Sequence, residues 1–201
     1  MNPYSLIGVA YLLGAIPFGY LVVKALGGAD IRAQGSGNIG AANVARNAGK
    51  LAGILTLLLD AGKGYMAVWI VARGTGGDAR WMIAAAVAAV IGHVFPLWLG
   101  FNGGKGVATC FGVILAICPQ AAAAAAALWV LVVLFWRYSS LGSIAAVAAL
   151  PGLVYLFYAP RHAPPTYVSL GVILISLLVL AKHRGNIQRL IAGEETPLKL
   201  G

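Results

Sequence analysis

The sequence predicts an all-α integral membrane protein with a single domain over residues 1–201. Of the 201 residues, 61% are hydrophobic and only 9% are charged, whereas soluble domains carry about 25% charged residues. The apolar residues form stretches long enough to cross a bilayer, and no polar segment is long enough to fold separately. The net charge of +9 is expected of cytoplasmic loops and of anionic lipid or substrate, and not of a nucleic-acid partner.

Seven apolar stretches are the expected membrane spans. The first, Tyr4–Leu26, is longer than a cleavable signal sequence and contains Pro17, which loosens a helix. The others follow in chain order: Leu51–Ala72, Trp81–Leu99, Val107–Cys118, Pro119–Trp136, Leu141–Tyr158 and Tyr167–Ala181. A proline-rich turn is expected at Ala159–Thr166, and the chain ends in a polar tail, Lys182–Gly201.

The basic residues orient these spans. With seven spans, one side of the membrane receives most of the 14 Lys and Arg residues: Lys24, Arg32, Arg46, Lys50, Lys105, Arg137, Lys182, Arg184, Arg189 and Lys199. The other side receives Arg73, Arg80 and Arg161, and Lys63 lies within a span. Because basic loops remain in the cytoplasm, we expect the N-terminus outside and the C-terminus in the cytoplasm.

The segment Leu99–Thr109, which reads L-G-F-N-G-G-K-G-V-A-T, is a candidate anion site. Gly103, Gly104 and Gly106 surround Lys105, and glycine leaves backbone N–H groups accessible because it has no Cβ. A helix that begins at Lys105 adds its own free N–H groups and the positive end of its dipole. The alternative is a loop that is rich in glycine only because helices pack closely there.

The helix after this loop is too short to cross the membrane alone. Lys105–Cys118 makes about 21 Å of helix, whereas the hydrocarbon core is about 30 Å thick. The helix must therefore begin below the headgroups, where irregular backbone is tolerated only beside a polar cavity. We expect short broken helices around a recessed phosphate-binding loop.

A second polar segment precedes the second span. Ser36–Arg46 reads S-G-N-I-G-A-A-N-V-A-R, and its arginine has a planar fork that suits phosphate or carboxylate. Ser and Asn also favour turns and helix starts for purely local reasons. The residues alone leave both interpretations open, a second anion site or an ordinary capped loop.

Ionisable residues also occur inside or next to the spans. Asp60 and Lys63 are three residues apart and can pair on one helix face, and we favour a structural pair over a functional one although intramembrane charges are often functional. His93, near the end of the third span, either packs or lines the pocket of the glycine loop. In the tail, His183 and Asn186 stand at positions i and i+3 of a short amphipathic helix expected at the membrane surface.

Some chemistries are disfavoured by what the sequence lacks. No Cys/His cluster has zinc spacing and no group of carboxylates suits magnesium, so we expect neither a metal nor a cofactor. No G-x-S-x-G elbow is present. The glycine loop differs from a nucleotide P-loop because Gly106 stands where Ser or Thr would hold magnesium.

Three motifs occur in one order: S-G-N-I-G-A-A-N-V-A-R (Ser36–Arg46), G-H-V-F-P-L-W-L-G-F-N-G-G-K-G-V-A-T (Gly92–Thr109) and N-I-Q-R-L-x-x-x-x-E-T (Asn186–Thr196). Together they resemble the PlsY family of bacterial glycerol-3-phosphate acyltransferases that use acyl phosphate. G-A-I-P-F-G-Y and D-A-G-K-G in the first two spans fit as well, so the resemblance covers nearly the whole chain. Two positions depart from it, because Ala42 stands where many relatives carry Thr and Asn102 where many carry Lys.

The resemblance implies transfer of a fatty acyl group from acyl phosphate to the primary hydroxyl of glycerol 3-phosphate. The products are lysophosphatidic acid and inorganic phosphate, in the first step of phospholipid synthesis. It also implies a bacterial inner-membrane protein, surrounded by membrane lipid, whose active site faces the cytoplasm, and we expect a monomer. Phosphate is a good leaving group, so the reaction needs no covalent enzyme intermediate.

The resemblance draws the expected site from all three motifs. The catalytic residues are Ser36, Arg46, Lys105, His183 and Asn186. The substrate- and phosphate-binding residues are Gly37, Asn38, Asn43, His93, Gly103, Gly104, Gly106 and Thr109. The structural residues are Asp60, Lys63 and Glu195. The proton of the attacking hydroxyl goes either to His183 or to a phosphate of the substrates.

Two other functions are compatible with the composition. A small transporter for an organic anion would use broken helices whose N-termini point at the anion, but we find no internal repeat. A scaffold protein of the membrane would not need a recessed glycine loop.

Overall fold

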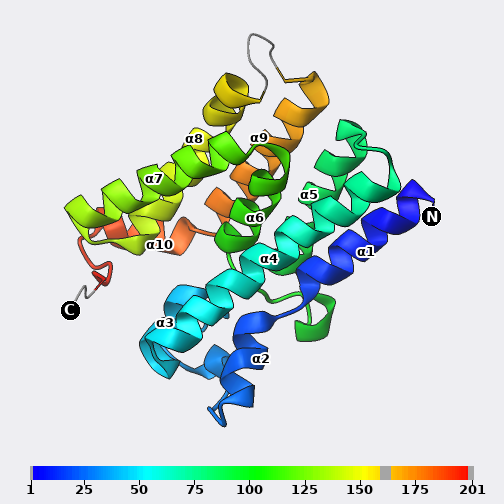
Figure 1. Ribbon diagram of the computed structural model, residues 1–201. Coiled ribbons are helices and arrows are strands. Elements are labelled where there is room, and N and C mark those ends of the chain that lie inside the picture. Colours follow the sequence, from blue (N-terminus) through cyan, green and yellow to red (C-terminus); the bar gives the residue numbers. More distant parts are fainter. Residues whose placement is uncertain (1, 159–163, 199–201) are drawn as a thin grey trace. The chain divides into compact units, whose positions relative to one another are not determined.

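The computed structural model describes residues 2–158 and 164–198, which form a succession of helices (Figure 1). The expected turn at Ala159–Thr166 and the end of the tail lie partly outside these described residues. The chain divides into two compact units, Met1–Ile117 and Cys118–Gly201. Each unit is described by itself.

The first unit is built around one long helix, α4 (Lys50–Gly74). Every other α-helix of this unit packs against it: α1 (Pro3–Ala15), α2 (Phe18–Ala25), α3 (Ala41–Ala48), α5 (Ala79–Val94) and α6 (Val107–Ile117). The packing is close because glycines face backbone, as at Gly112, where a Cβ would collide with the carbonyl group of Ala61. Such small-residue contacts are typical of helices that associate in lipid.

The first expected span is broken in the way that its proline predicts. α1 and α2 meet at an angle of 43°, and Pro17 lies between them. Proline cannot donate a backbone hydrogen bond and so interrupts the helical ladder. The carbonyl of Ile16, at this break, accepts a hydrogen bond from Lys63 Nζ of α4 at 2.6 Å.

The second unit contains α7 (Pro119–Trp136), α8 (Ser139–Phe157), α9 (Thr166–Ala181) and α10 (Arg184–Ile191). α8 packs against both α7 and α9. The polar tail folds back on this unit, since the backbone N–H of Leu198 donates to the carbonyl of Arg137 at 2.6 Å.

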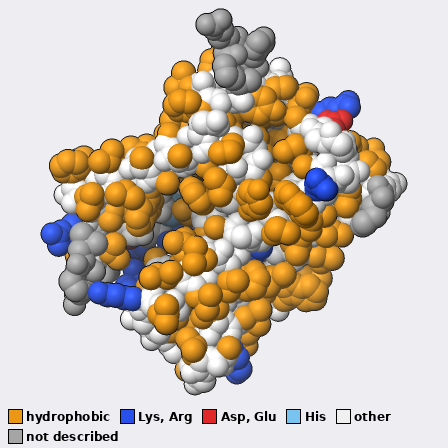
Figure 2. Space-filling view, viewed as in Figure 1, with side chains coloured by type: hydrophobic (Ala, Val, Ile, Leu, Met, Phe, Trp, Pro, Cys, Tyr) orange, Lys and Arg blue, Asp and Glu red, His pale blue; other side chains and the backbone are white. Residues whose placement is uncertain are grey.

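The helices have the length and composition of membrane spans. Within the described residues, four segments are long and apolar enough to cross a bilayer, namely Lys50–Gly74, Ala79–Leu99, Pro119–Trp136 and Ser139–Phe157. The number rises to six if each of two bent pairs, α1 with α2 and α9 with α10, is one span. The remaining expected span is α6, an apolar helix of 11 residues. Hydrophobic side chains dominate the face shown in Figure 2, as expected of a surface that meets lipid.

The third expected span remains long and apolar enough to cross a bilayer as Ala79–Leu99, although α5 itself ends at Val94, because Phe95 precedes Pro96 and a residue before proline avoids the helical conformation. Two expected helix boundaries were wrong. α6 begins at Val107 and not at Lys105, because Gly106 has a φ of 90°, outside the right-handed helical region. Cys118, which we expected in the same helix as Cys110, is the N-cap residue of α7.

Candidate functional site

The glycine loop, residues 103–106, is tied to the end of α5. Backbone N–H groups of Gly103 and Gly104 donate to the carbonyls of Val94 and His93, each at 3.1 Å. The first hydrogen bond onto α6 runs from Cys110 N–H to the carbonyl of Gly106 at 2.7 Å. The N–H groups of the first turn of α6 therefore have no acceptor within the helix, which is the arrangement that binds anions at helix N-termini. Lys105, half-buried in this loop, adds a positive charge.

His93 lies directly behind the loop. Its side chain is 3% exposed, and its Nδ1 is 3.1 Å from the hydroxyl of Thr109 and 3.6 Å from Oδ1 of Asp60. Asp60 in turn pairs with Lys63 at 2.7 Å, and both side chains are buried. The expected pairing of Asp60 with Lys63 is present, and it extends into a polar network that reaches the glycine loop.

The first polar segment is organised by one buried amide, Asn43. Its Nδ2 donates to the carbonyls of Asn38 at 2.8 Å and Gln34 at 3.0 Å, and its Oδ1 accepts from the backbone N–H of Ser36 at 3.0 Å. Asn43 is 2% exposed. Both sides of its amide therefore bind the loop that precedes it.

The other residues expected in this segment surround Asn43. Asn38 accepts from the backbone N–H of Gly40 at 2.8 Å through its side chain. Gly37 has a φ of 68°, which favours glycine at this turn. Ser36 and Arg46 are exposed. The segment is thus a capped loop from which the side chains of Ser36 and Arg46 reach the surface.

A hydrophobic cluster joins this segment to the glycine loop within the first unit. Ile39 and Val44 of the polar segment are buried in the cluster, and Leu99, four residues before Gly103, packs against it. The fold therefore anchors both candidate anion-binding segments to one apolar core. The sequence alone did not predict this shared core.

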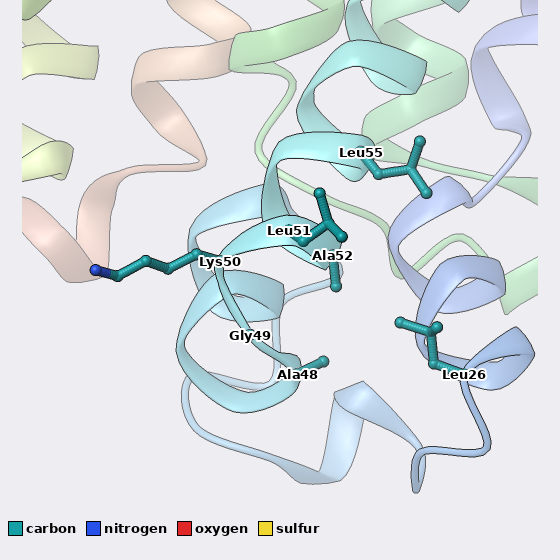
Figure 3. Close-up of a pocket in the computed structure, with 7 residues that line it drawn as sticks. All are labelled: Leu26, Ala48, Gly49, Lys50, Leu51, Ala52 and Leu55. Carbon is teal, nitrogen blue, oxygen red and sulfur yellow. The ribbon is translucent and has the colours of Figure 1, made fainter.

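A cavity of about 330 Å³ opens beside the start of α4 (Figure 3). It is lined by Leu26, Ala48, Gly49, Lys50, Leu51, Ala52 and Leu55. The side chain of Lys50 extends away from it in Figure 3, and none of the expected site residues lines it. We do not place the site in this cavity.

The second unit holds the remaining expected site residues. His183, buried at the start of α10, has its Nδ1 2.8 Å from the carbonyl of Val179. A carbonyl only accepts, so Nδ1 carries the proton, and in the neutral ring Nε2 has the lone pair. Asn186, one turn later, donates from Nδ2 to Oε1 of Glu195 at 2.7 Å.

Glu195 connects the tail to two helices. Its carboxylate accepts from the hydroxyl of Ser140 at 2.8 Å and from Nε of Arg189 at 2.8 Å, in addition to Asn186. Partial burial by itself raises the pKa of Glu195, but these three hydrogen bonds outweigh burial and hold the pKa below its usual 4.5. Sequence reasoning missed Ser140, since a single serine 55 residues away carries no signal of this contact.

Fold and loop together define a class: a helical membrane protein with a glycine loop and a lysine at the N-terminus of a short apolar helix. The family model for glycerol-3-phosphate acyltransferases matches residues 4–193. The chain therefore belongs to the glycerol-3-phosphate acyltransferase family, and specifically to its PlsY members.

The similarity covers nearly the full length of its relatives. The glycerol-3-phosphate acyltransferase of Syntrophotalea carbinolica is 48% identical over 98% of this chain and 97% of that one. The enzyme of Geobacter sulfurreducens is 47% identical over 99% of both chains.

Two solved structures have the same fold. Both are of PlsY, an integral membrane glycerol 3-phosphate acyltransferase, and both are 38% identical over 99% of this chain and 96% of theirs. The glycerol 3-phosphate form matches with a TM-score of 0.91 and the lysophosphatidic acid form with 0.89. Family membership makes the chain a transferase, in place of the transporter and the scaffold that its composition allowed.

Proposed function

We propose that the protein transfers a fatty acyl group from acyl phosphate to the primary hydroxyl of glycerol 3-phosphate. The observation that carries this is the N-terminus of α6, where Lys105 of the glycine loop lies beside the N–H groups of the first helical turn, while the N–H groups of Gly103 and Gly104 bind backbone carbonyls. Both substrates bear a phosphate, and a loop of this kind suits one. PlsY structures in glycerol 3-phosphate and lysophosphatidic acid forms support substrate and product of this type.

The reaction is an acyl transfer from a mixed anhydride. The hydroxyl oxygen of glycerol 3-phosphate attacks the acyl carbon, a new ester C–O bond forms, and the bond from the acyl carbon to the phosphate oxygen breaks. Inorganic phosphate leaves with the electron pair, and the hydroxyl proton moves to a base. The enzyme positions the hydroxyl and stabilises negative charge as it develops.

The glycine loop and Lys105 bind one phosphate, and Lys105 neutralises its charge in the transition state. Ser36, Asn38 and Arg46 hold the second phosphate or the acyl carbonyl. Asn43 acts on substrate through the loop that its amide holds in shape, because both ends of that amide already bind loop backbone.

His183 and Asn186 orient glycerol 3-phosphate. With Nδ1 bound to the carbonyl of Val179, the neutral imidazole can orient the substrate by accepting from its second hydroxyl at Nε2. A phosphate of the substrates takes the proton, since neither of the segments that form the site in the first unit, residues 36–46 and 99–109, contains a carboxylate.

We further propose seven spans, counting α6 and each bent pair as one span. This count places the N-terminus outside and the C-terminus in the cytoplasm, in agreement with the basic residues. The active site then faces the cytoplasm from the bacterial inner membrane, and the protein works as a monomer surrounded by lipid.

The test is acyl transfer by purified protein without added metal. Glycerol 3-phosphate is supplied with either palmitoyl phosphate or palmitoyl-CoA, and lysophosphatidic acid is measured. Product from acyl phosphate alone supports the proposal, and product from the CoA ester overturns the donor. Absence of product from both, in protein shown to be folded, overturns the function.

Paired variants separate the site from general effects of charge. Lys105→Ala is expected to abolish turnover at a normal protein level. Arg73→Ala, which removes a base whose guanidinium stacks on Trp69 at 5.7 Å from the ring centroid, is expected to retain it. Normal turnover by Lys105→Ala would remove the centre of the proposal.

A further inference from the structure

Residue 93 holds Gly104 from two directions. Its backbone carbonyl accepts the N–H of Gly104 at 3.1 Å. Its imidazole Nε2 lies where a Cβ on residue 104 would stand, so closely that an alanine there would collide with the ring. Only glycine lets the imidazole lie against the loop backbone in this way.

The imidazole is itself locked in place. Nδ1 is 3.1 Å from the hydroxyl of Thr109 and 3.6 Å from the carboxylate of Asp60. Asp60 is paired with Lys63 at 2.7 Å, and Lys63 also donates to the carbonyl of Ile16 at 2.6 Å. All four side chains are at most 5% exposed. The ring therefore cannot move away from Gly104 without breaking contacts in α4 and α6.

These contacts fix the peptide groups of the loop. The hydrogen bond from Gly104 sets the plane of the peptide before it, and the ring, which lies at the Cβ position of residue 104, closes the space on that side of the loop backbone. Anion binding by backbone depends on N–H groups that converge on one point before the anion arrives. A rigid support behind the loop supplies that preorganisation.

We propose that His93 is a positioning residue, which holds the glycine loop in its phosphate-binding conformation by filling the space that only glycine at 104 leaves open. This inference rests on the proposed function and assigns the Asp60–Lys63 pair and Thr109 to the support of His93. It differs from our expectation that His93 contacts substrate, because the ring lies behind the loop and is buried.

A double-substitution cycle tests the packing of His93 on Gly104. Gly104→Ala is expected to lower kcat/KM by about 10- to 100-fold in the parent, in the range of an overpacked core. In a His93→Ala background the same substitution should change kcat/KM by no more than about twofold. Differences of that size are expected even between independent substitutions. The new Cβ then occupies space that the ring has vacated.

Gly103→Ala is the matched control. A Cβ at 103 would collide with the backbone carbonyl of His93 and with Pro96, and removal of the imidazole relieves neither contact. We expect Gly103→Ala to be equally harmful with and without the ring. Equal cost of Gly104→Ala in both backgrounds would overturn the proposal.

Kinetic constants separate positioning from folding. His93→Asn retains a polar atom near Thr109 but empties the space beside Gly104. It should raise the KM of one phosphate-bearing substrate by about tenfold or more and leave the other KM within about twofold. A merely structural role would reduce the amount of folded enzyme, and hence the apparent kcat, with both KM values unchanged. That result would overturn the proposal.

A binding measurement distinguishes failure of this inference from failure of the proposed function. Glycerol 3-phosphate that binds the folded parent raises its unfolding temperature. If the parent binds glycerol 3-phosphate but transfers no acyl group, the proposed function is wrong. The double-substitution cycle is then measured by the shift in unfolding temperature instead of by kcat/KM. The inference stands if Gly104→Ala reduces the shift in the parent but reduces it little further in a His93→Ala background, and it falls if Gly104→Ala reduces the shift equally in both backgrounds.

Discussion

Replacement of Asn43 by Ala should open the first polar loop. The side chain donates to the carbonyls of Asn38 and Gln34, both at 3.0 Å or less, and to that of Ile31 at 3.4 Å, and it accepts from the N–H of Ser36 and from Asn47 Nδ2, both at 3.0 Å. A buried hydrogen bond contributes about 1 kcal/mol net, and more where a partner stays dry. We therefore expect a local loss of about 2–4 kcal/mol, or roughly 30-fold or more faster exchange of the loop amides. Hydrogen exchange of peptides covering residues 34–40 measures it.

The isosteric variant Asn43→Asp makes the test sharper. It keeps the acceptor for Ser36 but turns an oxygen toward the carbonyls of Asn38 and Gln34, where an ionised carboxylate is repelled. We expect loop protection to fall at least as far as in Asn43→Ala, while Arg46→Ala, which removes an exposed side chain from the same helix, changes it by less than about threefold. Parent-like protection in Asn43→Asp would refute the assignment of Nδ2 as donor and the reasoning built on it.

Three further predictions concern other polar groups. Because the pKa of Glu195 lies below its usual 4.5, its contribution to stability is full above that value and is lost as the pH falls through the folded pKa. Proteolysis of the tail should therefore increase only at acid pH in the parent and be independent of pH in Glu195→Gln. Lys63→Met leaves the Asp60 charge buried without its partner and should lower the free energy of unfolding by about 3–5 kcal/mol. The Asp60→Asn/Lys63→Met double variant should therefore unfold at a higher temperature than Lys63→Met alone. His183→Gln should lower kcat, but the fall of kcat at acid pH should remain. If that fall at acid pH disappears, His183 is the base.

The sequence predicted the class of the fold well because lipid imposes strong constraints. Apolar stretches located the long helices α4, α7 and α8 within two residues at each end, and Pro17 marked the break between α1 and α2. The errors fell at the two ends of α6, at Val107 and Cys118, where composition stays apolar but backbone geometry changes. A glycine with positive φ and a cap residue decide these ends, and hydropathy does not register them.

The candidate site was predictable in its residue types but not in their roles. Asn43 and His93 were both expected among the binding residues, because each lies in a motif that carries the resemblance. Burial distinguishes them from Arg46 and Ser36, which are exposed. Whether a polar side chain faces ligand or supports a loop depends on contacts such as Asn43 with Gln34, which spacing in a sequence does not reveal.

The buried pair of Asp60 and Lys63 shows why charged residues are retained in the membrane part of the first unit. At the break beside Pro17, the carbonyl of Ile16 accepts from the N–H of Phe18 at 3.1 Å and from Lys63 Nζ of another helix at 2.6 Å. An unpaired lysine is costly in lipid, so Asp60 must accompany it, and the same carboxylate lies 3.6 Å from His93 behind the glycine loop. A break near the start of the chain and the loop before α6 are thus linked by three side chains. If the link is energetic, the cost of Lys63→Met should be smaller in a chain that already lacks the His93 ring, a coupling that the unfolding temperatures of the two single variants and the double variant measure.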